Sequence, residues 1–189
     1  MILTGVKKVI LCSGFRKSGK DFLFRQIKEN GIESFPYNWK IIREDKNLQE
    51  EFLPMGTYIT DSFAAILKQE VRKIFGIEVT DQNKDQPLEN GLTPRRYCID
   101  LALFRRRENP AYFAESVMRK YYIDHHSDKI LYISDWRYHN EYETAIKYFG
   151  KESIITIRLH SCSNLVPPLD AVEEHQLDNF NFDLILERD

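Results

Sequence analysis

The sequence predicts a single α/β domain in which a parallel sheet of about five strands is flanked by helices in three layers. Short apolar runs at 9–11, 130–135 and 154–159 are bounded by turn residues, as buried parallel strands are. Longer stretches between these runs carry apolar residues at helical spacing. The 189 residues, 42% hydrophobic and 30% charged, can bury one substantial core, so we expect one domain over 1–189.

The first strand leads into a glycine-bracketed loop that opens a helix. Gly14 and Gly19 frame the spacing G-x-x-x-x-G-K, which ends in Lys20. Glycines let successive backbone N–H groups point inward at phosphate oxygens, and the lysine reaches the β- and γ-phosphates of a nucleotide. A chance glycine turn before a helix is the alternative interpretation. Asp21 replaces the Ser or Thr that normally follows the lysine, so Mg²⁺ would be held differently, for example by this carboxylate through water.

The remaining elements follow from apolar spacing together with caps, prolines and glycines. The stretch 35–42 alternates aromatic and polar residues as a short strand does, and Phe182 to Leu186 forms the last strand. The polar segment 161–176, with its proline pair, is expected to be a lid. The expected helices run from Lys20 to Asn30, from the cap at 60–62 to Gly76, from Pro94 through Arg107, from Asn109 to about His125 and from Asn140 to Gly150.

Charged residues at the ends of these elements are the next candidates. Because parallel strands present their carboxyl ends to one crevice, Asp135 is expected beside the glycine loop, where it would bind Mg²⁺ or its water. An ordinary strand-ending turn residue is the alternative, and Arg137 follows at the crevice mouth. Arg95 begins a helix, where a cation opposes the helix dipole, which suggests an anionic ligand. For the run Arg105–Arg107 a solvated face is favoured, since adjacent side chains point in different directions around a helix.

Composition limits the partners. A net charge of −2 carries no basic surplus, so we expect no nucleic acid as a partner. No apolar stretch approaches the roughly 20 residues that span a bilayer, so no membrane partner is expected either. Cys12, Cys98 and Cys162 are odd in number and lack metal-ligand spacing, which favours incidental thiols in a reducing, cytoplasmic compartment. The sequence allows a homodimer but does not require one.

Five segments, taken together, carry a family likeness. They are Gly14–Asp21, the helix from Thr60-Asp61 to Lys68, Thr93-Pro94-Arg95, the motif Asp135-x-Arg137-Tyr138-x-Asn140-Glu141, and Leu177-Asp178-Asn179-Phe180-x-Phe182-Asp183. Through these segments the chain resembles the phage and viral deoxynucleoside monophosphate kinases of the P-loop kinase superfamily, and the related animal-type phosphomevalonate kinases. The likeness runs across nearly the whole chain in one order.

The two branches share different segments with this chain. The loop form Arg16–Phe22 and the segment 177–180 resemble the phosphomevalonate kinases. The segments 135–141, 93–95 and 61–68 resemble the deoxynucleotide kinases, which we favour. Phosphomevalonate kinase activity stays open as the alternative. A nucleotide-binding protein without turnover is an alternative from another class.

The resemblance implies a P-loop kinase fold, an ATP and Mg²⁺ requirement, and a nucleoside monophosphate as small-molecule substrate. It further implies that the helices at about 57–126 bind the acceptor, and that a viral relative would act in the host cytoplasm. One departure is that the lid segment 161–176 contains no Arg or Lys, so that Arg158 is the nearest cation. The implied residues are Lys20, Arg16 and Arg137 for catalysis; Gly14, Lys17, Ser18, Gly19, Lys20, Asp21 and Phe22 for ATP; Asp61, Lys68, Arg95 and Arg137 for the acceptor; and Asp21 and Asp135 for the metal.

Overall fold

A computed structural model describes residues 6–15, 18–30, 39–44, 58–123, 128–161 and 175–188. It contains a six-stranded sheet with the order β2-β6-β5-β1-β4-β3. Five strands run parallel, and β2 pairs antiparallel with β6 at one edge. The strands are β1 (Lys8–Gly14), β2 (Trp39–Glu44), β3 (Tyr58–Asp61), β4 (Ile130–Ile133), β5 (Ile154–Ser161) and β6 (Leu184–Arg188).

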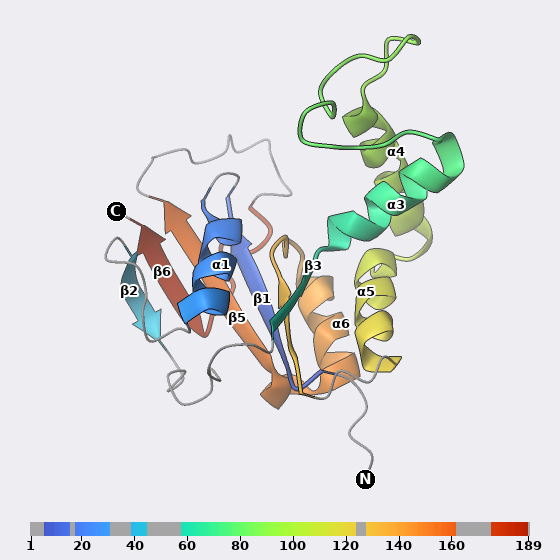
Figure 1. Ribbon diagram of the computed structural model, residues 1–189. Coiled ribbons are helices and arrows are strands. Elements are labelled where there is room, and N and C mark those ends of the chain that lie inside the picture. Colours follow the sequence, from blue (N-terminus) through green and yellow to red (C-terminus); the bar gives the residue numbers. More distant parts are fainter. Residues whose placement is uncertain are drawn as a thin grey trace.

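The helices cover both faces of this sheet, as a three-layer α/β fold requires (Figure 1). They are α1 (Lys20–Asn30), α3 (Phe63–Phe75), α4 (Pro94–Glu108), α5 (Tyr112–Ile123) and α6 (His139–Phe149), with a short 3₁₀ turn at Lys151–Ser153.

Alternation along the central strand builds two cores. Val9 and Leu11 of β1 join the buried cluster that includes α5 and α6, whereas Ile10 and Cys12 join the cluster that includes α1. Successive strand residues point to opposite faces, so a continuous apolar run is buried on both sides. Burial from water raises the pKa of the Cys12 thiol to about 11, which suits an inert core cysteine.

The five expected helices are confirmed, but α5 begins at Tyr112 and not at Asn109, and its expected end near His125 lies outside the described residues. Ser62 caps α3 by accepting a hydrogen bond from the Ala65 N–H, and Thr93 caps α4 in the same way. Gly76 ends α3 in the left-handed conformation, with φ of 69°. The element order therefore follows from local signals that the sequence carries.

Two features of the sheet differ from the sequence prediction. The sequence predicts about five strands, whereas the sheet has six: the additional strand is β3, at the sheet edge beside β4, and its last two residues overlap the predicted helix cap at 60–62. The stretch expected at 35–42 forms β2 from Trp39 to Glu44, and it runs antiparallel to the other strands. The expected lid, apart from its first residue and its last two, lies outside the described residues.

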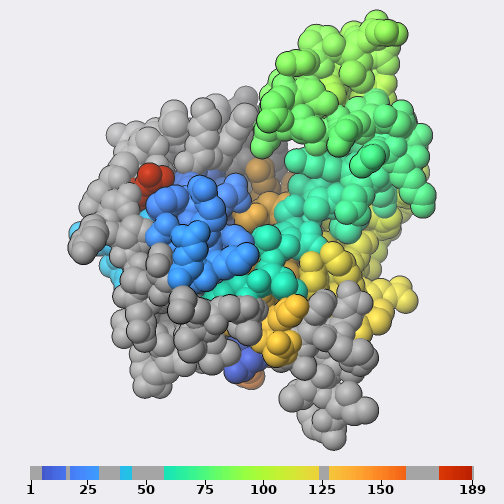
Figure 2. Space-filling view, viewed as in Figure 1, coloured from blue at the N-terminus to red at the C-terminus, as the bar shows by residue number. Residues whose placement is uncertain are grey.

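The helices α3 and α4 with their connecting segment rise above the carboxyl edge of the sheet (Figure 1). In the space-filling view, the surface is hollowed between the light green atoms that precede α4 and the blue atoms of α1 (Figure 2). Among the described residues, no helix is both long and apolar enough to pass through a bilayer.

Candidate functional site

The glycine loop opens at the carboxyl end of the central strand β1. A Cβ added to Gly14 would lie 2.5 Å from Ser18 Oγ and 2.9 Å from the carbonyl oxygen of Leu159, closer than any side chain tolerates. Gly19 has φ of 94°, a conformation that favours glycine. Both glycines are therefore required by the shape of this loop, and a loop with this backbone freedom can present N–H groups to an anion.

Lys20 closes the loop from the first position of α1. Its ammonium nitrogen Nζ lies 2.7 Å from the carbonyl oxygen of Gly14, 2.9 Å from that of Phe15 and 3.4 Å from Ser18 Oγ. Tyr132, from β4, donates to the carbonyl oxygen of Lys20 at 3.1 Å and fixes the start of the helix. A charged amine held by neutral acceptors next to a helix N-terminus is well placed for a phosphate.

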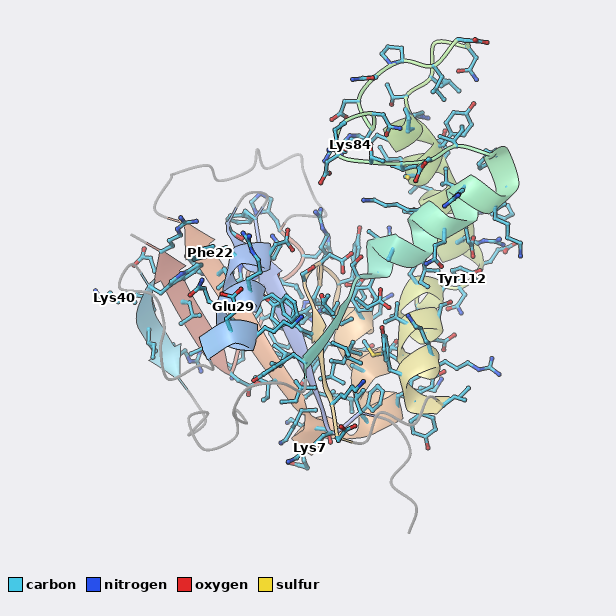
Figure 3. The ribbon with its side chains drawn as sticks, viewed as in Figure 1. Lys7, Phe22, Glu29, Lys40, Lys84 and Tyr112 are labelled. Carbon is cyan, nitrogen blue, oxygen red and sulfur yellow. The ribbon has the colours of Figure 1, made fainter. Side chains whose placement is uncertain are left out.

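The other predicted loop residues are only partly described. Arg16 and Lys17 lie outside the described residues. Asp21 is exposed in the first turn of α1, where its charge complements the helix dipole, and Phe22 follows on the same helix, as Figure 3 shows. In the described part of the chain, no three His, Cys, Asp or Glu side chains gather as a metal site would require.

Asp135 follows β4 by two residues, and each of its oxygens accepts a hydrogen bond from the backbone of α3. Oδ1 accepts from the N–H of Phe63 at 2.9 Å, and Oδ2 accepts from that of Ala64 at 2.8 Å. The carboxylate thus occupies the N-terminus of α3 and satisfies two donors that a helix leaves unpaired. Burial raises the pKa of Asp135, an effect that these N–H groups and the charge of Arg137 oppose. Its predicted role toward Mg²⁺ stays a prediction.

A pocket of about 410 Å³ opens next to Asp135, between α3, α4 and the start of α6. Three arginines line it: Arg95 and Arg106 of α4, and Arg137 from the turn after β4. Arg106 packs its guanidinium carbon 4.6 Å from the ring centre of Tyr138 and 5.4 Å from that of Phe113, and it forms no ion pair with a described residue. The other walls are apolar, being formed by Phe63, Ala64, Leu67, Cys98, Ile99, Ala102 and Leu103.

Glu141 is a second acid in this pocket, and unlike Asp135 it is buried. Its side-chain oxygen Oε2 accepts hydrogen bonds from the N–H of Arg137 at 2.9 Å and from that of Tyr138 at 3.0 Å. The residue is 4% exposed. Burial raises the pKa of its carboxyl group to about 8, although the two N–H groups favour the charged form. An acid that is largely neutral at pH 7 repels an anionic ligand less than a carboxylate would.

The acceptor residues implied by the resemblance do not all meet at the pocket. Asp61, at the end of β3, accepts hydrogen bonds from Lys120 and from the Tyr121 hydroxyl, both at 2.9 Å. Lys68 is exposed on α3 and does not line the pocket. The structure therefore does not bring Asp61 and Lys68 to one cleft with Arg137.

Arg95 does line the pocket, but it has a partner within the protein. Its guanidinium forms an exposed ion pair with Asp85, with Nη2 3.0 Å from Oδ2. The hydrogen bond to Asp85 is the main reason that the pKa of Arg95 is raised. The charge at the start of α4 therefore has a partner within the protein, supplied by the segment before the helix, and the role of Arg95 toward an anionic ligand stays a prediction. Figure 3 labels Lys84, the neighbour of Asp85, in that segment.

Arg158, the cation nearest to the predicted lid, is not available to a ligand. It is 5% exposed, and its guanidinium donates to Ser13 Oγ at 2.9 Å and to Asp178 Oδ1 at 3.1 Å. Its guanidinium carbon lies 4.7 Å from the ring centre of Phe15 and 5.7 Å from that of Phe182. Arg158 therefore ties the loop side of β1 to the segment that precedes β6.

Sequence reasoning missed Arg106 and Glu141 as site residues. Within the run Arg105–Arg107, the flanking residues have other roles: Arg105 pairs with Glu70 at 2.9 Å, and Arg107 is exposed. A helical signal could have found Arg106, because Arg95, Ala102 and Arg106 recur at three- and four-residue steps with Cys98 and Ile99 between them. The solvated-face interpretation of the run was therefore wrong for its central member.

Comparison with known proteins gives no family assignment. No protein-family model matches the chain, and no curated protein matches it significantly.

Proposed function

We propose that this protein transfers the γ-phosphoryl group of ATP to a phosphate-bearing acceptor, as a (deoxy)nucleoside monophosphate kinase of the P-loop type. One observation supports the proposal: the Lys20 loop and an arginine-lined pocket both follow the carboxyl ends of adjacent parallel strands. The Lys20 loop follows β1, and the pocket with Arg106 and Arg137 follows β4, which pairs with β1 in parallel from Lys8↔Ile130 to Leu11↔Ile133. Phosphoryl transfer needs two phosphates aligned and their charge neutralised, more than it needs an acid or a base.

On the donor side, the loop 14–20 would hold the ATP phosphates, with Lys20 exchanging its carbonyl partners for phosphate oxygens. Arg16, in the loop, would assist. Mg²⁺ would neutralise phosphate charge, and Asp21 is the exposed carboxylate that could hold it, directly or through water. Asp135 could join it directly or through water, because each of its oxygens accepts one hydrogen bond from α3 and keeps a second lone pair.

On the acceptor side, Arg106 and Arg137 would hold the phosphate and Arg95 would lie farther along α4. Guanidinium groups bind phosphate through two parallel N–H donors, and the aromatic rings of Tyr138 and Phe113 keep Arg106 oriented. The missing lid cations are not replaced by Arg158, which is committed to Ser13 and Asp178.

The second candidate is phosphomevalonate kinase activity, and one observation favours it. The polar side chains that line the pocket are the three arginines, Tyr138, the thiol of Cys98 and the acids Asp135 and Glu141. The rest of the described lining is apolar, and no side-chain amide or aliphatic hydroxyl group is present to read a base edge. Such walls suit a small branched ester as well as a nucleobase. A nucleotide-binding protein without turnover is the third candidate.

Release of ADP in a coupled assay separates these candidates. Deoxynucleoside monophosphates, nucleoside monophosphates and phosphomevalonate are offered in turn with ATP and Mg²⁺. Turnover with one nucleotide class supports the proposal, and turnover with phosphomevalonate alone supports the second candidate. ATP binding by calorimetry without turnover of any acceptor would support the third. Absence of both ATP binding and turnover would overturn all of them.

A further inference from the structure

The turn between β4 and α6 carries Arg137, one of the three arginines that line the pocket. It spans Ser134–Tyr138, and Tyr138 is the N-cap of α6. Two N–H groups of this turn, those of Arg137 and Tyr138, are the donors that Glu141 satisfies with a single oxygen. The indole N–H of Trp136 fixes the same turn from the other side by donating to the carbonyl oxygen of Tyr138 at 2.8 Å.

We propose that Glu141 is a positioning residue for the acceptor anion, because its side-chain oxygen holds the two N–H groups that fix the backbone beneath Arg137. This inference rests on the proposed function and deepens it at the same pocket. Glu141 comes from the first turn of α6, so it also joins the turn rigidly to a helix. A side chain that binds through a fork of donors loses affinity when its base moves by even 1 Å.

Substitutions can distinguish the hydrogen-bonding role of Glu141 from a role that depends on its negative charge. The two bonds need an acceptor oxygen at the end of a four-atom reach, and they do not need a negative charge. Glu141→Gln keeps the oxygen and the reach, so it is expected to bind and turn over like the wild type. Glu141→Asp keeps the acid and shortens the reach, and Glu141→Ala removes both bonds. Both of these should raise the acceptor KM about 10- to 100-fold at nearly constant kcat, since binding geometry alone is disturbed.

The chain provides its own reporters for an equilibrium test. It has two tryptophans, Trp39 and Trp136. The ring of Trp39 lies beside the glycine loop, where Cζ2 and Cη2 would be 3.6 Å from a Cβ at Gly19, while Trp136 belongs to the turn that Glu141 holds. Protein labelled with 5-fluorotryptophan therefore gives one ¹⁹F signal for each half of the site.

Inorganic phosphate is titrated into the labelled wild type, the three Glu141 variants and Glu143→Ala, which removes an exposed acid from the same helix as a matched control. We expect the Trp136 signal to report binding in the wild type, Glu141→Gln and Glu143→Ala, and about 10-fold weaker binding in Glu141→Asp and Glu141→Ala. Unchanged affinity in Glu141→Asp would overturn the inference, as would equal weakening in Glu141→Gln. If Glu141→Ala does not fold, the Asp and Gln variants decide. If phosphate does not shift the Trp136 signal of the wild type, the pocket does not bind the acceptor phosphate, and the proposed function is wrong.

Discussion

The carboxylate of Asp135 accepts a hydrogen bond of 2.8 Å from the backbone N–H of Ala64, at the start of α3. This contact joins the carboxyl end of a central strand to the helix that forms one wall of the arginine-lined pocket. A residue that the sequence suggests as a metal ligand therefore has a structural role, since it holds the N-terminus of α3 against the carboxyl end of β4. The two roles can be separated by experiment.

Asp135→Asn places an amide donor against one of the two helix N–H groups. We expect the free energy of unfolding to fall by about 1–3 kcal/mol, because one buried N–H loses its acceptor. If Asp135 also acts through Mg²⁺, turnover with the metal should fall much more than metal-free ATP binding. Urea unfolding measures the first effect, and ATP titrations with and without Mg²⁺ measure the second. Equal losses with and without the metal would leave Asp135 a structural residue alone.

Lys20→Ala removes the ammonium that closes the glycine loop. We expect turnover to fall by roughly 10²-fold or more, since one charged group that clamps the transferring phosphate is worth a few kcal/mol in the transition state. The fold should remain, because Lys20 bonds to loop carbonyls and not to the core. Circular dichroism checks the fold, and Lys28→Ala, on the exposed last turn of the same helix, is the control. A near-normal kcat in Lys20→Ala would show that the loop lysine does not contribute to phosphoryl transfer.

Arg106→Met and Arg107→Met form a matched pair of neighbours with opposite environments. Arg106 lines the pocket, whereas Arg107 is exposed. Loss of Arg106 should reduce kcat/KM for the acceptor by about 10- to 10³-fold, as a lost charged contact costs a few kcal/mol. Loss of Arg107 should change it little. Steady-state kinetics with each substrate varied in turn decides the assignment.

The same kinetics apply to Arg95→Met and Arg137→Met. Arg137→Met should raise the acceptor KM strongly and leave ATP affinity almost unchanged. We expect a smaller effect for Arg95→Met than for Arg137→Met, because Asp85 already neutralises Arg95. Lower ATP affinity with a normal acceptor KM would mean that these arginines serve the donor phosphates instead.

Glu141 should make the protein less stable as the pH rises. Its pKa is about 8 in the folded protein against an ordinary value of 4.5, so between these values the folded state binds more protons than the unfolded state. Linkage then requires the free energy of unfolding to fall from about pH 4.5 to about pH 8, by at most about 1.4 kcal/mol per pH unit from this group. Glu141→Gln should remove that part of the slope. Urea unfolding of both proteins across this pH range is the measurement, and equal slopes would contradict the assignment.

Arg158→Met should loosen the segment before β6. The substitution leaves Ser13 and Asp178 without their guanidinium partner, and we expect a loss of about 1–3 kcal/mol, since Asp178 is partly exposed and can be solvated. Backbone amides at 175–183 should exchange faster with deuterium, while α5 should be unaffected. Slower or unchanged exchange in this segment would show that other contacts hold it.

The sequence by itself determined the helices, the central strands and the glycine loop. Caps such as Ser62 and Thr93, stop signals such as Gly76, and the apolar run that includes Val9–Cys12 act within a few residues of the element they define. Gly19 follows from local geometry through its left-handed φ, whereas the tight approach to Gly14 comes both from Ser18 in the loop and from Leu159 of the neighbouring strand β5.

Only the tertiary structure decided which charged side chains meet. Arg105 forms an ion pair with Glu70, Arg95 with Asp85 and Asp61 with Lys120. In each pair the partner comes from another segment of the chain. The edge strand β3 was likewise hidden, because four residues gain their structure from pairing with β4 and not from their own pattern. The physical reason is the distance along the chain over which each interaction acts. Caps and apolar periodicity act between residues a few positions apart. Ion pairs, aromatic packing on Arg106 and the desolvation of Asp135 and Glu141 depend on which distant segments the fold packs together.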